Sequence, residues 1–135
     1  MNSKTNIDIH FKGNSFSPKK LSELTRLPIE SLVESGEISK IGRYRGKPSP
    51  YGIGLLKLNP EENVIDKYCT ILLGYKSALK ESKVEEILFD IETNDGFQYF
   101  SILPKTAKIL STLNARIEFH KIPQNEEDRL PLNKI

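Results

Sequence analysis

Three segments of the chain alternate apolar and polar side chains with a period of two residues. Their apolar positions are Ile7, Ile9 and Phe11; Ile87, Phe89 and Ile91; and Ala115, Ile117 and Phe119. This period is typical of β-strands that bury one face and expose the other. The pattern therefore predicts a sheet with one face packed on a core and one face that is wet and charged.

The longest predicted helix covers about residues 59–82. Asn59 is expected to cap it, and Pro60 to occupy its first position, where a missing N–H loses no hydrogen bond. Apolar side chains then recur every three or four residues, at Val64, Ile65, Tyr68, Ile71, Leu72, Tyr75 and Leu79. This stripe predicts a helix that packs one face against the sheet.

Two shorter helices are predicted at residues 17–27 and 104–113, each opened by a proline. The segments that contain these openings, residues 16–24 and 102–110, align with Pro, Lys and a final Leu in register. Two β-α-β units that flank the long helix would form a ferredoxin-like pseudo-repeat. The alternative is that Pro-Lys simply opens helices well.

The remaining strands are expected near Ile38 and Ile41, at residues 53–58, and at residues 97–102 after the Asn94-Asp95-Gly96 turn signal. The predicted order is β-α-β-β-α-β-β-α-β. This order predicts an α+β fold, a mixed and mainly antiparallel sheet with three helices packed on it. Residues 1–122 are expected to form a single domain, and residues 123–135, which show no periodicity, a loosely ordered tail.

Composition excludes several classes of protein. The chain has 135 residues, 37% of them hydrophobic, and 20 Lys and Arg against 18 Asp and Glu give a net charge of +2, which disfavours a strongly basic nucleic-acid binder. One cysteine permits no intrachain disulfide. No apolar run approaches the roughly 20 residues of a membrane span, and no secretory signal is apparent. We expect a cytoplasmic protein without a cofactor and without membrane contact.

Motifs of common enzymes are absent from the sequence: it has no Walker loop, no Gly-x-Gly-x-x-Gly, no His-Glu-x-x-His and no Gly-x-Ser-x-Gly. Gly52-Ile53-Gly54 is read as a strand bend or bulge. Cys69 lies near the apolar stripe of the long helix and is read as a core residue. We therefore expect no catalytic residues and no enzymatic activity.

One segment carries segregated positive charge. Between Ile38 and Pro60 the basic residues are Lys40, Arg43, Arg45, Lys47 and Lys57, with no acidic residue among them, and Tyr44 and Tyr51 lie between the charges. Guanidinium groups pair with carboxylates and phosphates, and tyrosine rings stack on bases. The basic loop, residues 40–51, is therefore a candidate site for an anionic partner, either an acidic protein face or nucleic acid. The plain alternative is a solvated surface loop.

A second candidate site lies on the polar phase of the strands. His10 and His120 are the only histidines, and Asp8 and Glu118 share their phase, as do Asp90 and Glu92. If the first, fourth and last strands are neighbours, these groups face one another, as a divalent metal or an acid–base pair would require. The alternative is the ordinary charged face of a two-layer domain.

The sequence also resembles a bacterial family, domain of unknown function family 4279. The likeness rests on residues 13–21, on Leu27-Pro28 and on the turn at residues 34–37 (Glu-Ser-Gly-Glu), and it spans about residues 7–122. It implies a small cytosolic domain without an established activity and offers no catalytic residues. Some members resemble immunity-type proteins of bacterial toxin systems.

Together these observations predict a non-catalytic binding protein whose partner is another protein, with an immunity-like role towards a toxin as the specific expectation. The second hypothesis is a nucleic-acid or phosphoanion binding module that uses the basic loop. The third is an enzyme that depends on a metal or on acid–base chemistry.

Overall fold

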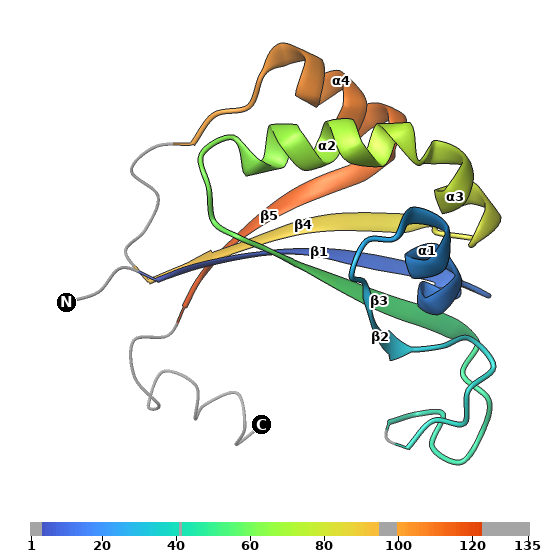
Figure 1. Cartoon of the computed structure of the whole chain (residues 1–135). Coiled ribbons are helices and arrows are strands. Elements are labelled where there is room, and N and C mark those ends of the chain that lie inside the picture. Colours follow the sequence, from blue (N-terminus) through green and yellow to red (C-terminus); the bar gives the residue numbers. More distant parts are fainter. Residues whose placement is uncertain (1–3, 41, 95–99, 123–135) are drawn as a thin grey trace.

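The computed structural model describes residues 4–40, 42–94 and 100–122 and folds them into one five-stranded sheet with four helices (Figure 1). The strands are β1 (Thr5–Asn14), β2 (Glu30–Val33), β3 (Tyr51–Leu58), β4 (Glu86–Thr93) and β5 (Ala115–Lys121). The helices are α1 (Pro18–Thr25), α2 (Val64–Gly74), α3 (Lys76–Glu81) and α4 (Pro104–Thr112). The α+β class predicted from the pattern is confirmed.

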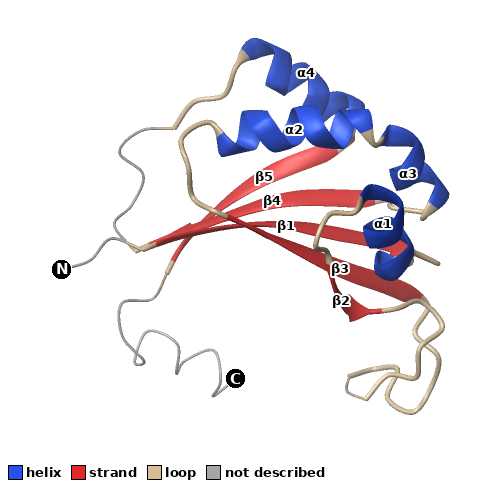
Figure 2. Cartoon of the chain, in the orientation of Figure 1, coloured by secondary structure: helices blue, strands red, loops and turns tan. Residues whose placement is uncertain are grey.

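The sheet has the strand order β2-β3-β1-β4-β5. Every neighbouring pair is antiparallel except β4 and β5, which run parallel and are joined through α4. All four helices of the described residues pack on the same face of the sheet, so none of them covers the opposite face (Figure 2). The sheet is thus mixed and mainly antiparallel, as the order of the elements predicted.

The core lies between the helices and the covered face. Ile9 and Phe89, which are opposite each other on β1 and β4, are both fully buried. The helices contribute further buried side chains, among them Leu21, Val64, Ile65, Cys69, Leu72 and Leu79. The apolar phase of the strands and the apolar stripe of the long helical segment therefore meet in one cluster.

Two β-α-β units flank the central helices, but they differ in kind. β1 and β2 run parallel with β3 inserted between them, which is a split unit, whereas β4 and β5 are direct neighbours. A ferredoxin-like pseudo-repeat would need both units to be split. The order along the chain also departs from the prediction, since it has four helices and no strand between β4 and α4 in the described residues.

The long helix is shorter and interrupted. It begins at Val64 rather than after Asn59, because the chain first turns through Asn63, whose φ is 63° in the left-handed region. It breaks at Tyr75, where the backbone leaves helical geometry with φ −107° directly after Gly74, a residue that weakens helices. Two helices, α2 and α3, therefore replace the single helix expected.

Two predicted strands are also corrected. Ile38 lies in an isolated bridge with Pro48, whereas the second strand is β2, four residues long and too short to show a period. β1 and β5 occupy both sides of β4, which leaves no place beside it for a hairpin return strand, and Ile102 lies outside any strand. Ile41, residues 97–99 and the tail at 123–135 lie outside the described residues.

The glycines of β3 serve close packing rather than a bend. A Cβ on Gly52 would lie 2.1 Å from the backbone oxygen of Phe16, and one on Gly54 would lie 3.2 Å from the side chain of Pro18. The pairing of β3 with β1 runs through both positions without a shift, and the irregularity lies on β2 between Ser31 and Val33. The two glycines let the start of α1 rest directly on the sheet.

Within the described part of the chain, no helix has the length and apolar character to cross a membrane.

Candidate functional site

The uncovered face of the sheet, called here the open face, carries the polar phase of the strands. Asp8, Asp90 and Glu118 lie opposite one another on β1, β4 and β5, and His10, Leu88 and Arg116 form the next row. The strand order makes β1, β4 and β5 neighbours. The sequence predicted that the histidines and carboxylates face one another if these three strands are neighbours, and in the structure they are neighbours.

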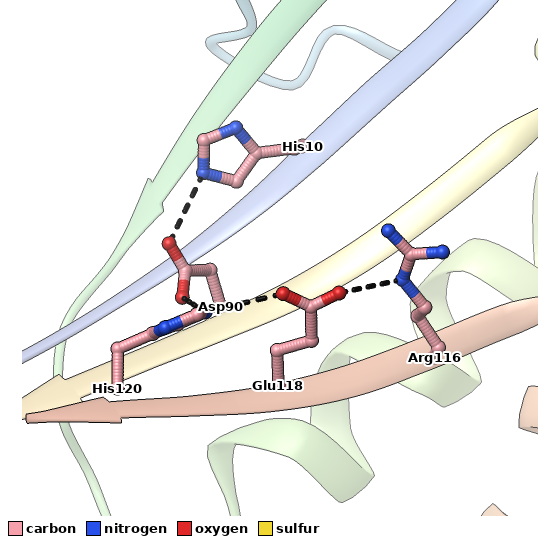
Figure 3. A network of polar contacts seen from close by, with 5 residues as sticks. All are labelled: His10, Asp90, Arg116, Glu118 and His120. Carbon is pink, nitrogen blue, oxygen red and sulfur yellow. Dashed lines mark hydrogen bonds and ion pairs between the residues drawn. The ribbon is translucent and has the colours of Figure 1, made fainter. Parts of the chain in front are cut away.

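Five of these side chains form a chain of polar contacts across three strands (Figure 3). Asp90 lies between the two imidazoles, with Oδ2 3.6 Å from His10 Nε2 and Oδ1 3.4 Å from His120 Nε2. His120 Nε2 is also 3.1 Å from Glu118 Oε1, and Glu118 Oε2 accepts from Arg116 Nε at 2.8 Å. Of the four residues predicted for this site, His10, Glu118 and His120 belong to this polar network, and Asp8 lies opposite Asp90.

Asp90 is the centre of the polar network. Its side chain is only 15% exposed, and its Oδ1 atom has no hydrogen-bond partner among the described residues. The approach of His120 to that oxygen is an ion-pair distance, longer than a well-formed N–H···O bond. The groups at ion-pair distance from Asp90 are therefore the two imidazoles, which carry positive charge only when they are protonated.

Asp8 adds negative charge beside Asp90. Burial raises the pKa of the Asp8 carboxyl above its ordinary value, His10 lowers it, the neighbouring charge of Asp90 raises it, and Lys57 lowers it. Burial is the largest of these causes, because removal of water penalises the charged form. Two carboxylates thus share a partly desolvated part of the open face.

A hollow of about 400 Å³ lies next to the polar network. The residues that line it are His10, Lys12, Ile53, Glu86, Ile87, Leu88, Asn114, Ala115 and Arg116. Small-molecule sites commonly have volumes of about 300–1,000 Å³, with apolar walls and a few polar groups. The hollow has this composition, since apolar side chains of β3 and β4 and cations of β1 and β5 line it together.

The basic loop adjoins the same face. The side chains of Lys40, Arg43, Arg45 and Lys47 are exposed, while the Tyr44 and Tyr51 rings pack edge to face with centroids 6.1 Å apart. Tyr51 begins β3, and Lys12 Nζ lies 5.4 Å from its ring centroid. Of the six residues predicted for an anionic partner, Tyr44 and Tyr51 contact each other, and Tyr51 and Lys12 connect the basic loop to the open face.

Hydrogen bonds order the described backbone of the basic loop and of the residues just before it. Gly46 N–H donates to Ser39 O at 2.8 Å, and Ser49 N–H donates to Glu37 O at 2.8 Å. Ser49 is buried, and its hydroxyl donates to Tyr51 O at 2.8 Å. These bonds hold the two limbs of the loop together and present the charged side chains outward.

No protein-family model, curated protein or solved structure matches the chain. The resemblance to family 4279 therefore stays a prediction, and the function is argued from the geometry.

The described residues contain no group of three or more His, Cys, Asp or Glu side chains arranged to hold a metal ion. Cys69 is buried, and burial, followed by the nearby charge of Asp66, raises the pKa of its thiol to about 11. Lys12 and Arg116 were not predicted as site residues. Both share the polar phase of the strands with His10 and His120, so the alternation itself contained the signal for them.

Proposed function

We propose that this is a non-catalytic binding protein that binds another protein with the open face and the basic loop. The observation that supports this most directly is continuity: Lys12 and Tyr51 connect the basic loop to a sheet face that none of the described helices covers (Figure 2). A rigid sheet that presents one uncovered face and one ordered loop offers a preformed docking surface.

The open face has the composition of an interface. Ile53, Leu55 and Leu88 lie on it and remain partly exposed, although apolar residues are not needed on a purely solvated face. Along one row across the sheet, Leu55, His10, Leu88 and Arg116 follow one another, so apolar and polar side chains alternate on this face. Protein–protein interfaces likewise combine apolar and polar contact area.

Nucleic acid is the second candidate, and the exposed arginines of the basic loop favour it. Two features weigh against it. The open face carries the acidic side chains Asp8, Glu86, Asp90, Glu92 and Glu118, most of them outside the hollow, and these repel an extended phosphate backbone that crosses the whole face. In addition, the rings of Tyr44 and Tyr51 contact each other, and Lys12 lies over Tyr51, so the rings are already engaged where bases would stack.

The more specific role proposed is that of an immunity-like partner of a bacterial toxin, which rests on the resemblance to family 4279. A toxin gene adjacent to the gene for this protein would support it. The toxin surface would present carboxylates to Arg43, Arg45 and Lys47, because these exposed cations have no acidic neighbour between residues 38 and 60. Acid–base catalysis by His10 beside Asp90 is the third candidate function.

Affinity capture from nuclease-treated extracts of the native host tests the proposal. The baits are the wild-type protein, the loop variant Arg43→Glu/Arg45→Glu, and the matched control Lys76→Glu/Lys105→Glu. The control reverses two exposed charges on the helical side, each in the first turn of a helix where acidic residues are tolerated.

We expect one protein to be retained by the wild type and the control and lost from the loop variant, and the purified partner to rebind with the same pattern. Equal retention by all three baits would contradict the proposal. Loss of all captured material after nuclease treatment would favour the nucleic-acid alternative.

A further inference from the structure

The hollow on the open face has a polar rim that is rich in cations. Lys12 comes from β1 and Arg116 from β5, and both are exposed, with His10 and Asn114 on the same rim. Glu86 is the one carboxylate among the lining residues, and it lies opposite Lys12 in the pairing of β1 with β4. Two permanent cations, Lys12 and Arg116, therefore face the hollow from two strands, and each has one carboxylate near it, Glu86 and Glu118 respectively.

The two cations approach from different strands and are held differently. Arg116 is anchored by Glu118 through Nε, a contact that does not use the terminal nitrogens of the guanidinium group. Lys12 lies over the ring of Tyr51. A guanidinium group fixed at one nitrogen can still bind an oxyanion with its other donors, and an ammonium group adds a second point of attachment.

His10 joins the hollow to the polar network. Its Nε2 atom faces Asp90, a carboxylate that is mostly withdrawn from solvent. The two groups lie 3.6 Å apart, within ion-pair distance. The His10 ring therefore lies between Asp90 and the hollow, next to any anion that binds there.

The apolar lining completes the site. Ile53 on β3 and Leu88 on β4 are partly exposed in the hollow, on either side of His10 and Lys12 in the strand order. From these observations we infer that the hollow binds a small organic anion, a carboxylate or phosphate group on an apolar body. The oxyanion contacts Lys12 and Arg116, and the apolar body lies against Ile53 and Leu88.

This inference does not depend on the proposed protein partner, because the hollow is formed by residues of this chain alone. Its test uses benzoate and phenyl phosphate as probes at constant ionic strength, with benzyl alcohol as the neutral control. The readout is the imidazole Cε1–H resonances in NMR spectra, because the chain has only two histidines. His10 lines the hollow, whereas His120 does not and serves as an internal reference.

We expect at least one anion to shift the His10 resonance saturably in the millimolar range, and His120 to move less. Lys12→Gln and Arg116→Gln should each weaken this binding tenfold or more, whereas Lys57→Gln, on the same face outside the hollow, should change it less than twofold. Retention of binding by Lys12→Gln or Arg116→Gln would overturn the inference. So would equal binding of benzyl alcohol, equal loss in Lys57→Gln, or no saturable shift with either anion.

Discussion

Asp8 and Asp90 lie directly opposite each other on β1 and β4, so two carboxylates meet in the middle of the open face. Like charges in opposed positions of a sheet destabilise it. Burial is the main cause that raises the pKa of Asp8, and the charge of Asp90 contributes as well. Residues that lower the stability of a fold are expected at positions where a surface serves binding.

Replacement of Asp8 by asparagine should therefore stabilise the protein at neutral pH. The folded-state pKa of Asp8 lies above its ordinary value of 3.8, so the folded state binds the proton more tightly than the unfolded state does. The contribution of Asp8 to the free energy of unfolding thus falls as pH rises from 3.8 through the raised pKa, and at higher pH the ionised carboxyl destabilises the folded state. Urea denaturation of Asp8→Asn should show a higher free energy of unfolding than the wild type at pH 7, and this difference should shrink below pH 3.8.

The exposed Glu23→Gln in α1 is the control and should change little at either pH. A loss of stability in Asp8→Asn of the same size at both pH values would show that the pKa of Asp8 is not raised.

The Cys69 thiol should be almost unreactive in the folded protein. Its pKa is raised from 9.0 to about 11, which leaves roughly a hundredfold less thiolate at pH 8, and the side chain is fully buried. A colorimetric thiol reagent should react slowly with the native protein and rapidly in urea. Rapid native reaction would mean that α2 opens readily or that Cys69 is not buried.

Asp66 should be required for the docking of α4. It is buried on α2, and its Oδ1 atom accepts from the Leu103 N–H at 3.0 Å and from the Thr106 hydroxyl. It therefore satisfies donors at the start of α4, where no side chain of α4 itself forms a cap. Asp66→Ala should cost about 1–3 kcal/mol in the free energy of unfolding, because it leaves the buried Thr106 hydroxyl without this partner.

Asp66→Asn keeps an acceptor oxygen at the same place and should lose less. Equal losses in the two variants, measured by urea denaturation, would argue against a capping role.

Leu72→Ala should cost about 2–5 kcal/mol, because Leu72 is 1% exposed in the core cluster and its truncation leaves a cavity. Lys76→Ala, on the exposed side of α3, should cost less than about 0.5 kcal/mol. Thermal or urea unfolding measures both changes in the free energy of unfolding. Similar losses in the two variants would mean that α2 and α3 do not pack on the sheet with the face described above.

The sequence predicted those features that depend on local periodicity. Alternation located β1, β4 and β5 and separated their buried and open faces, and the proline openings located α1 and α4. Ser17 caps α1, and its hydroxyl oxygen accepts from Lys20 N–H at 3.2 Å. Asn114, between α4 and β5, has a left-handed conformation with φ 53°.

Features that depend on contacts between distant segments could not be predicted in this way. β2 has four residues, and only its pairing with β3 makes it a strand. Asn59 followed by proline has the chemistry of a helix start, yet the chain continues through a turn until Asn63. The contact of Lys12 with Tyr51 and the register of His10 opposite Leu88 depend on strand pairing across long stretches of chain. These pairings place the hollow beside the polar network.

We propose that a protein partner covers the open face, and the imidazole resonances of the two histidines measure its binding there. His10 and His120 both lie on that face, whereas Tyr68 and Tyr75 belong to the helical side. Titration with the purified partner should shift or broaden both imidazole resonances to saturation and leave the ring resonances of Tyr68 and Tyr75 unchanged. Binding that perturbs the two tyrosines and leaves both histidines unchanged would contradict the claim.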